Sequence, residues 1–127
     1  KSRQPATFED FVWWSGLTIT DCRKAIYLLG DYLHKQELFG QEFYLTEDCK
    51  VHGSYQEEYQ LMPSYDEYLI SYKSRQLVLS SENKHKAHNN NGIFQPIIAR
   101  KGVICGNWSP NSIELYKKYH LNLYNFK

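Results

Sequence analysis

The chain lacks a long hydrophobic run. No stretch of its 127 residues approaches the roughly 18 to 20 consecutive apolar residues that a membrane-spanning helix needs. The first five residues are not followed by the apolar core of a secretory signal. We therefore expect a cytoplasmic protein with no membrane partner. The chain also begins without Met and runs directly into a helix signal, so we expect it to be cut from a longer parent.

Cysteine is scarce and widely spaced. The three residues are Cys22, Cys49 and Cys105, and no Cys-x-x-Cys pair occurs. This excludes a disulfide framework and predicts reduced thiols. The sequence also lacks a Gly-rich phosphate loop, a Gly-x-Ser-x-Gly turn and a Cys/His nucleophile pair. We therefore predict no catalytic residue, no cofactor and no metal in this chain.

The net charge of +1 hides an asymmetry along the sequence. Residues 1–72 carry 6 Lys and Arg against 12 Asp and Glu, a net charge of −6. Residues 73–127 carry 9 against 2, a net charge of +7. A polyanion is expected to bind the second half. The aromatic content of 16% indicates a folded chain rather than a disordered one.

The first helix signal covers residues 8–15. Thr7 can cap it, and Glu9 and Asp10 lie in the first turn, where the helix dipole favours negative charge. Gly16 is a typical residue for the position after a helix. The pattern predicts a short helix that ends at residue 15.

A second helix signal follows at once. Thr18 and Asp21 have the spacing of a capping box, and Gly30 supplies the stop. One apolar stripe at helical spacing is formed by Ile19, Cys22, Ile26 and Leu29. Two capped helices joined by a short turn are typical of a helix-turn-helix.

After the second helix signal, the spacing of apolar residues no longer fits a helix. Residues 32–38 and 42–46 can each be extended, and residues 39–41 between them contain Gly, which predicts a β-hairpin. Helix, turn, helix and hairpin is the order of a winged helix. Residues 47–60 are polar, and we expect a linker or loop there.

The second half reads as β-rich. Residues 65–72 are aromatic and partly alternating, residues 80–92 form a polar loop, and residues 93–100 and 103–108 flank a Lys-Gly turn typical of a hairpin. Residues 112–120 can be extended or helical. Alternation near the end favours a strand over Tyr119, Leu121 and Leu123.

Several residue pairs could carry chemistry. His85 and His88 have a metal-ligand spacing, as do Cys49 and His52, but no further ligand lies at a matching distance, so we favour a solvated or phosphate-touching loop. The other two pairs are acidic and aromatic: Asp66 with Glu67, and Trp13 with Trp14.

Each of these two pairs has a structural and a functional interpretation. Asp66 and Glu67 could divide acid and base roles, although Asp also caps turns and Arg75 is a nearby partner. Trp13 and Trp14 could stack on bases, but adjacent helical positions point about 100° apart, so we expect one of the two in the core.

Three segments resemble one protein family. Residues 5–17 (PATFEDFVWWSGL) are similar to the opening of the last winged helix in the bacterial winged-helix DNA-binding domain family, which includes the AlkZ-like alkylpurine DNA glycosylases. Residues 61–69 (LMPSYDEYL) resemble its Leu-Pro-x-Phe/Tyr-Asp-Glu-Tyr segment. Residues 91–96 (NGIFQP) and 102–108 (GVICGNW) resemble its closing hairpin. The resemblance covers nearly the whole chain.

The resemblance implies a parent with about three winged helices and a C-terminal β-barrel module, which form a concave DNA-binding surface in the glycosylases. It places the catalytic Gln-x-Gln or Gln-x-Asp motif upstream. No Gln of this chain fits that motif, and the nearest match, at residues 56–58, lies in the polar linker. Whether the parent is an enzyme therefore stays open.

We accordingly expect an α+β fold, with a winged helix-turn-helix over residues 1–60 and a basic, barrel-like β-rich module over residues 61–127. The expected partners are double-stranded DNA and the upstream winged-helix domains of the parent. Charge clustering predicts six phosphate contacts: Lys73, Arg75, Lys84, Lys86, Arg100 and Lys101.

Two alternatives remain. One is a transcriptional regulator that reads DNA sequence, which the mixed charge of the second helix disfavours. The other is a protein-interaction domain without a role in nucleic-acid binding, which an exposed apolar patch at Trp13 or Trp14 would favour.

Overall fold

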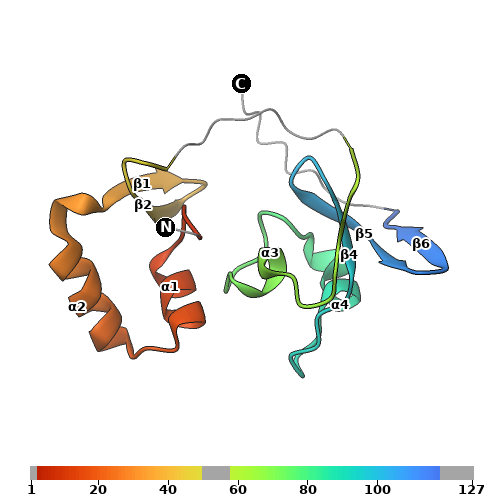
Figure 1. Cartoon of the computed structure of the whole chain (residues 1–127), viewed down its shortest axis with the longest axis horizontal. Coiled ribbons are helices and arrows are strands. Elements are labelled where there is room, and N and C mark those ends of the chain that lie inside the picture. The colour runs from red at the N-terminus through yellow and green to blue at the C-terminus, as the bar shows by residue number, and fades with distance from the viewer. Residues whose placement is uncertain (1–2, 50–57, 118–127) are drawn as a thin grey trace. The chain divides into compact units, whose positions relative to one another are not determined.

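The computed structural model describes residues 3–49 and 58–117, which belong to two compact units (Figure 1). Unit 1 consists of Lys1–Gly53 together with Ser71–Lys73. Unit 2 consists of Ser54–Ile70 and Ser74–Lys127. Unit 1 is therefore discontinuous in sequence.

Helix α1 of unit 1 covers Phe8–Ser15, as the capping signals predict. The backbone N–H of Asp10 donates to the Thr7 hydroxyl and the N–H of Thr7 donates to the Asp10 carboxylate, each at 3.1 Å, so two unpaired donors of the first turn are satisfied. Gly16 ends the helix with a φ of +68°, a conformation that costs a residue with a Cβ about 1 kcal/mol or more.

Helix α2 covers Ile19–Leu29 and begins at a second polar cap. The N–H of Asp21 donates to the Thr18 hydroxyl at 3.1 Å, and that hydroxyl donates to the Asp21 carboxylate at 2.7 Å. Cys22 is the one buried residue of this helix. The other residues of the predicted apolar stripe, Ile19, Ile26 and Leu29, are therefore not buried in the described part of unit 1. A 3-10 turn, η1, covers Gly30–Tyr32.

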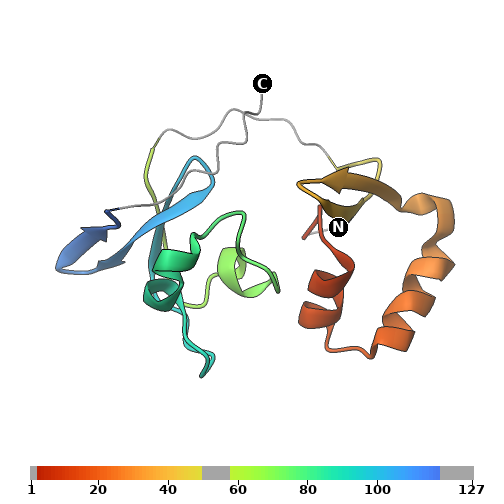
Figure 2. The same cartoon turned by 180° about the vertical axis from the view of Figure 1, so that it is seen from behind.

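The predicted hairpin follows. Strand β1, His34–Leu38, pairs antiparallel with β2, Gln41–Leu45, and the turn residues Phe39 and Gly40 have φ of +54° and +72°. The hairpin lies at the end of the two helices opposite to the turn that joins them (Figures 1 and 2). The expected order of two helices and a hairpin is therefore present.

Unit 2 contains a four-stranded antiparallel sheet in the order β3-β4-β5-β6. Its strands are β3 (Gln60–Met62), β4 (Ile97–Arg100), β5 (Val103–Ser109) and β6 (Ser112–Leu115). A barrel requires its first and last strands to pair. In the part of the chain that the structure describes, β3 and β6 are opposite edges and do not pair, so the sheet is open rather than closed into the expected barrel.

Short helices replace two expected non-helical segments. Residues 65–72, expected to be extended, contain helix α3 at Glu67–Ile70, which the Asp66 carboxylate caps by accepting from the N–H of Tyr68 at 2.9 Å. The predicted loop at 80–92 contains a 3-10 turn, η2, at Ser81–Asn83 and helix α4 at Lys84–Ala87. Of the two alternatives for residues 112–120, the extended one holds over β6, and the predicted strand at 119–123 lies outside the described residues.

The core of unit 2 forms where α3 and α4 pack on the sheet. The Trp108 indole N–H donates to the carbonyl of Met62 at 2.8 Å and so ties β5 to β3. One buried cluster joins both helices to the two central strands, and its members are Leu69, Leu79, Ala87, Ile97, Ile104 and Tyr116.

Candidate nucleic-acid interface

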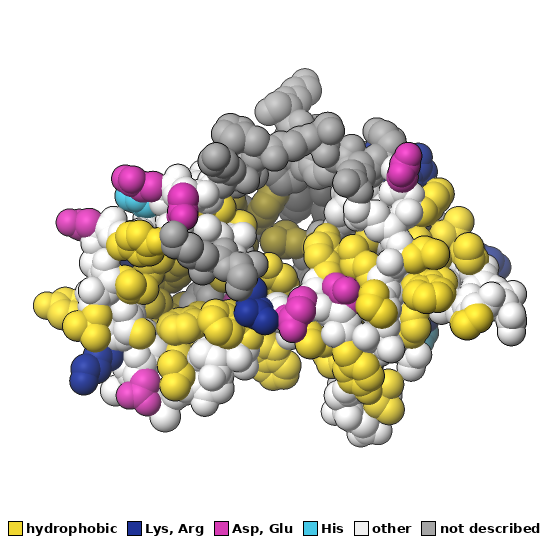
Figure 3. Space-filling view, viewed as in Figure 1, with side chains coloured by type: hydrophobic (Ala, Val, Ile, Leu, Met, Phe, Trp, Pro, Cys, Tyr) yellow, Lys and Arg dark blue, Asp and Glu magenta, His cyan; other side chains and the backbone are white. Residues whose placement is uncertain are grey.

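Sorting the charges by structural unit removes most of the asymmetry seen along the sequence. Unit 1 carries 7 Lys and Arg against 8 Asp and Glu, a net charge of −1. Unit 2 carries 8 against 6, a net charge of +2. Within each unit, the basic side chains visible in Figure 3 lie among apolar and acidic ones. Any attraction for a polyanion therefore depends on local groups of cations.

Arg100 and Lys101 form one such group, at the turn between β4 and β5. Lys101 and Gly102 have φ of +51° and +76°, and the Tyr68 hydroxyl donates to the carbonyl of Gly102, which ties the turn to α3. The Arg100 guanidinium lies 5.1 Å from the centre of the Tyr59 ring, which is 49% exposed. The structure thus brings these two predicted residues together on a supported turn.

Lys84 and Lys86 form a second group along the chain, on α4, where side chains two residues apart point about 200° apart. Lys84 is exposed, whereas Lys86 is half-buried, with its Nζ 3.2 Å from the Glu114 carboxylate and 5.2 Å from the centre of the Tyr116 ring. The Asn107 side chain donates to the carbonyl of Lys86 at 3.2 Å. The acid on β6 therefore competes with any phosphate for Lys86.

Arg75 is held inside unit 2. Its Nε donates to the carbonyl of Leu69 at 2.6 Å, and its guanidinium lies 5.1 Å from the centre of the Phe94 ring. His88 stacks on Phe94 with ring centres 5.4 Å apart. Burial, with the charges of Arg75 and Lys84 as further causes, lowers the pKa of His88 below its ordinary value near 6.5. These contacts give Arg75 a structural role besides any role with phosphate.

Lys73 belongs to unit 1, whereas the other predicted residues belong to unit 2. Its backbone N–H donates to the Asp10 carboxylate at 2.8 Å, and its Nζ lies 6.0 Å from the centre of the Trp13 ring. The neighbouring residue Ser71 accepts from Arg3 Nε at 2.9 Å. The segment Ser71–Lys73 is therefore fastened to the start of unit 1.

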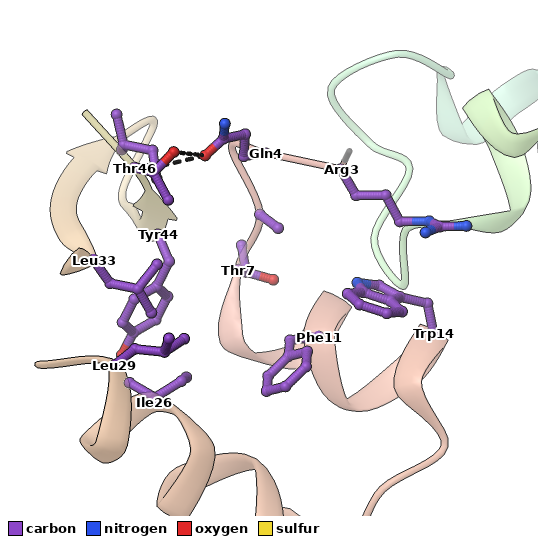
Figure 4. A pocket seen from close by; sticks show the side chains of 12 residues that line it. Arg3, Gln4, Thr7, Phe11, Trp14, Ile26, Leu29, Leu33, Tyr44 and Thr46 are labelled. Carbon is purple, nitrogen blue, oxygen red and sulfur yellow. Dashed lines mark hydrogen bonds between the residues drawn. The ribbon is translucent and has the colours of Figure 1, made fainter. Parts of the chain in front are cut away.

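A cavity of about 210 Å³ opens between α1, α2 and β2 (Figure 4). Its apolar walls include Trp14, Leu29 and Tyr44. At one end, the Gln4 side-chain oxygen accepts from the backbone N–H and the hydroxyl of Thr46, at 2.8 and 2.9 Å. The Arg3 guanidinium lies 4.9 Å from the centre of the Trp14 ring. An engineered apolar cavity of roughly 150 Å³ binds benzene, so this one can accept an apolar side chain.

The candidate chemical pairs do not assemble into a catalytic or metal centre in residues 3–49 and 58–117. No group of three or more His, Cys, Asp and Glu there could hold a metal ion. His85 is exposed while His88 is buried against Phe94, and Asp66 caps α3. His52, which was paired with Cys49, lies outside the described residues. So does Gln56, the first residue of the nearest match to the Gln-x-Gln or Gln-x-Asp motif. No helix in the described ranges is long and apolar enough to cross a membrane.

Sequence reasoning missed Arg3, Ser71 and Asp10 as residues that position Lys73 and the two tryptophans. The capping box pointed to Asp10 as a helix cap, but its second acceptor role depends on a contact between residues far apart in sequence. Both tryptophans are exposed, Trp13 by 50% and Trp14 by 43%. The expectation that one of them is in the core is therefore wrong, and among the described elements α1 packs mainly on α2 and β2.

Comparisons with known proteins agree with the resemblance found in the sequence. A family model described as DNA glycosylase AlkZ-like matches residues 1–113. The solved structure of Streptomyces sahachiroi DNA glycosylase AlkZ is similar, with a TM-score of 0.78 and 19% sequence identity. The match covers 91% of this chain and 34% of that protein, so the chain spans about a third of its length. No curated protein sequence matches the chain.

Proposed function

Because this chain belongs to the DNA glycosylase AlkZ-like family, we propose that it is a DNA-binding part of a DNA-repair protein. The observation that carries the proposal is the family match over residues 1–113, which covers unit 1 and unit 2 as far as residue 113. The chain spans about a third of the solved relative, so the repair reaction of the longer protein is a separate proposal. No Gln-x-Gln or Gln-x-Asp motif occurs in this sequence, and we assign the chemistry to upstream domains.

We further propose that the two helices and the hairpin of unit 1 act as a winged helix, joined to winged-helix domains upstream. The support is the order α1, α2, β1, β2 with short connections. Near its start α2 exposes Arg23 and Lys24 but also the acid Asp21, whereas a helix that reads base edges presents Arg, Asn or Gln there. A sequence-reading role for α2 is therefore disfavoured.

In this proposal double-stranded DNA contacts unit 2 through its phosphates, with the two basic groups as separate points of attachment. Asn107 pairs with Ile97 at the start of β4 and donates to the carbonyl of Lys86, whereas Arg100 ends the same strand. The two groups thus mark opposite ends of β4, roughly 10 Å apart along the strand. Phosphates of one DNA strand rise about 3.4 Å per step, so such a spacing spans several of them.

The four cations of the two basic groups should contribute unequally to DNA binding, because their surroundings differ. Lys84 is exposed and can reach a phosphate with little rearrangement, whereas Arg100, which lies over the Tyr59 ring, and Lys101 are half-buried at the β4–β5 turn. Lys86 has to exchange the Glu114 carboxylate for a phosphate. Arg75 and Lys73 complete the proposed set, Arg75 from its position against Phe94 and Lys73 from unit 1.

The test is fluorescence anisotropy of a labelled duplex titrated with the chain over a range of salt concentrations. We expect binding that weakens linearly in log salt. The Arg100→Ala/Lys101→Ala double variant should have a slope smaller by about 1.8, because each phosphate contact contributes about 0.9. Arg23→Ala/Lys24→Ala is the matched control, since it removes two exposed basic residues from α2. Its slope should stay close to that of the unchanged chain.

Equal losses in both double variants would show that net charge alone drives binding, and would overturn the assignment to the β4–β5 turn. A folded chain that binds no duplex at low salt would overturn DNA binding by this chain. The exposed apolar side chains on α2, Ile19, Tyr27 and Leu28, would then favour a protein-interaction domain.

A further inference from the structure

Trp13 is an exposed aromatic residue with a cation beside it. Half of its surface is accessible although it lies on a helix of a small unit, and the Lys73 ammonium is 6.0 Å from the centre of its ring. An exposed aromatic ring beside a cation combines the two groups that hold single-stranded nucleic acids, a stacking surface and a phosphate contact. The pair joins residues that are 60 positions apart in sequence.

The position of Lys73 is fixed by its backbone rather than by its side chain. Asp10 is 4% exposed, and its carboxylate accepts from the N–H of Lys73 at 2.8 Å and from the N–H of Thr7 at 3.1 Å. Two residues earlier, the Ser71 hydroxyl accepts from Arg3 at 2.9 Å. The backbone is therefore held beside α1, while the ammonium stays exposed at the surface.

We propose that Trp13 and Lys73 form a nucleotide site, in which an unpaired base of DNA stacks on the Trp13 indole and an adjoining phosphate binds Lys73. The inference rests on the proposed function and deepens it, because it gives unit 1 a preference for single-stranded DNA. A base within an intact duplex is stacked on both sides and has no face to offer, so paired DNA should use the proposed phosphate contacts without stacking on Trp13.

Trp14 is a matched control for Trp13. It is the next residue on α1, is 43% exposed, and carries its own cation, Arg3, 4.9 Å from its ring centre. Adjacent helical positions point about 100° apart, so the two rings face different directions. Trp14 lines the cavity between α1, α2 and β2, which gives it a packing role that Trp13 is not assigned.

The test compares Trp13→Leu with Trp14→Leu in binding to a fluorescently labelled oligothymidine of about ten nucleotides. Leucine keeps the apolar character and helix propensity but cannot stack. We expect Trp13→Leu to weaken binding about tenfold, since one base–aromatic stack has that order of effect. Trp14→Leu should change binding less than twofold. Urea denaturation checks beforehand that both variants are folded.

A second readout uses the intrinsic fluorescence of the three tryptophans. Oligothymidine should quench the emission of the unchanged chain and of Trp14→Leu, and it should leave Trp13→Leu unquenched. Lys73→Gln should retain the quenching but reduce the salt slope by about 0.7, the value for one contact to a single strand.

The outcomes separate this proposal from the proposed function. Binding of duplex but no quenching by oligothymidine would overturn the nucleotide site and leave DNA binding intact. Quenching that is lost in Trp14→Leu and kept in Trp13→Leu would assign stacking to Trp14 and also overturn it. Absence of both duplex and oligothymidine binding would overturn the function itself.

Discussion

The buried carboxylate of Asp10 accepts a hydrogen bond of 2.8 Å from the backbone N–H of Lys73, which lies 63 residues further along the chain. The same carboxylate caps α1 through the N–H of Thr7. One side chain therefore accepts from an N–H group at the start of α1 and also holds the distant segment Ser71–Lys73 beside that helix.

Replacing Asp10 by Ala should destabilise unit 1 by about 2 to 4 kcal/mol, because two backbone donors lose an ionised acceptor in a buried position. Asp10→Asn keeps an acceptor oxygen, and we expect roughly half that effect. Urea denaturation followed by circular dichroism measures both. Glu9→Ala, on the exposed preceding residue, is the control, and a loss in Glu9→Ala equal to that in Asp10→Ala would contradict the role of the buried carboxylate.

Gly106 lies on β5 opposite Leu115 of β6, with no room for a side chain. A Cβ built at this position would be 2.4 Å from the carbonyl oxygen of Glu114 and 3.2 Å from Leu115 Cδ2. Because the first contact is with backbone, Gly106→Ala should separate the strands and lower the stability of unit 2 by about 1 to 3 kcal/mol. Chemical denaturation gives the magnitude.

Gly92→Ala is a useful comparison for that variant. Gly92 has a φ of +74° but no atom within 4 Å of an added Cβ, so its cost is backbone strain alone, about 1 to 2 kcal/mol. If Gly106→Ala proves as stable as the unchanged chain, the close pairing of β5 with β6 is wrong.

His88 should make unit 2 sensitive to mild acid. Burial, with Arg75 and Lys84 as further causes, lowers its pKa below 6.5 in the folded state, so the unfolded chain takes up the proton first as the pH falls. The stabilisation is complete above about pH 6.5 and is lost as the pH falls through the folded pKa.

The prediction is a fall in the urea midpoint between about pH 7.5 and about pH 5.5 that His88→Phe reduces. Phenylalanine keeps a ring against Phe94 and cannot take up a proton. His85→Phe changes an exposed histidine three residues earlier and should retain the pH dependence of the unchanged chain. Equal slopes in the two variants would exclude His88 as the cause.

Glu114 should weaken DNA binding, because its carboxylate lies 3.2 Å from Lys86 Nζ. Glu114→Gln removes one repulsive charge near the phosphates, and about 0.7 kcal/mol at roughly 6 Å in water corresponds to an affinity about threefold higher. Duplex anisotropy at low salt measures it. Because this repulsion acts on the phosphate directly, the gain from Glu114→Gln should remain in a Lys86→Ala background. Its loss there would show that the acid acts only by competing for Lys86.

Local signals predicted the helices and hairpins that have strong caps and turns. Thr7, Gly16 and Thr18 act within a few residues of themselves, and the structure has α1 and α2 where they indicate. The Lys101–Gly102 turn was equally local. In each case one polar side chain or one glycine determines the backbone conformation of its own turn.

Helices of four residues were missed for a physical reason. The helices α3 and α4 each complete about one turn, which is too short for apolar residues to repeat at helical spacing. Alternating aromatic residues at 65–72 therefore favoured a strand. What holds α3 is the Asp66 cap and the burial of Leu69 in the core, and the second of these depends on the sheet.

The site was the least predictable part, because charge along a sequence is not charge on a surface. The segment Ser71–Lys73 places a basic residue of the second half in unit 1, and Asp66 and Glu67 of the first half belong to unit 2. Sequence alone grouped six cations. The structure divides them into two pairs on unit 2, the arginine against Phe94, and Lys73 beside Trp13.

The discontinuity of unit 1 also sets an order of events during synthesis on the ribosome. Translation adds about 5 to 20 residues per second, so roughly one to four seconds pass between the emergence of Gly53 and that of Lys73. Throughout that interval the Asp10 carboxylate lacks its hydrogen bond from the N–H of Lys73. Unit 1 can complete its hydrogen bonds only after the first segment of unit 2 has been made, so the two units mature as interleaved parts of one nascent chain.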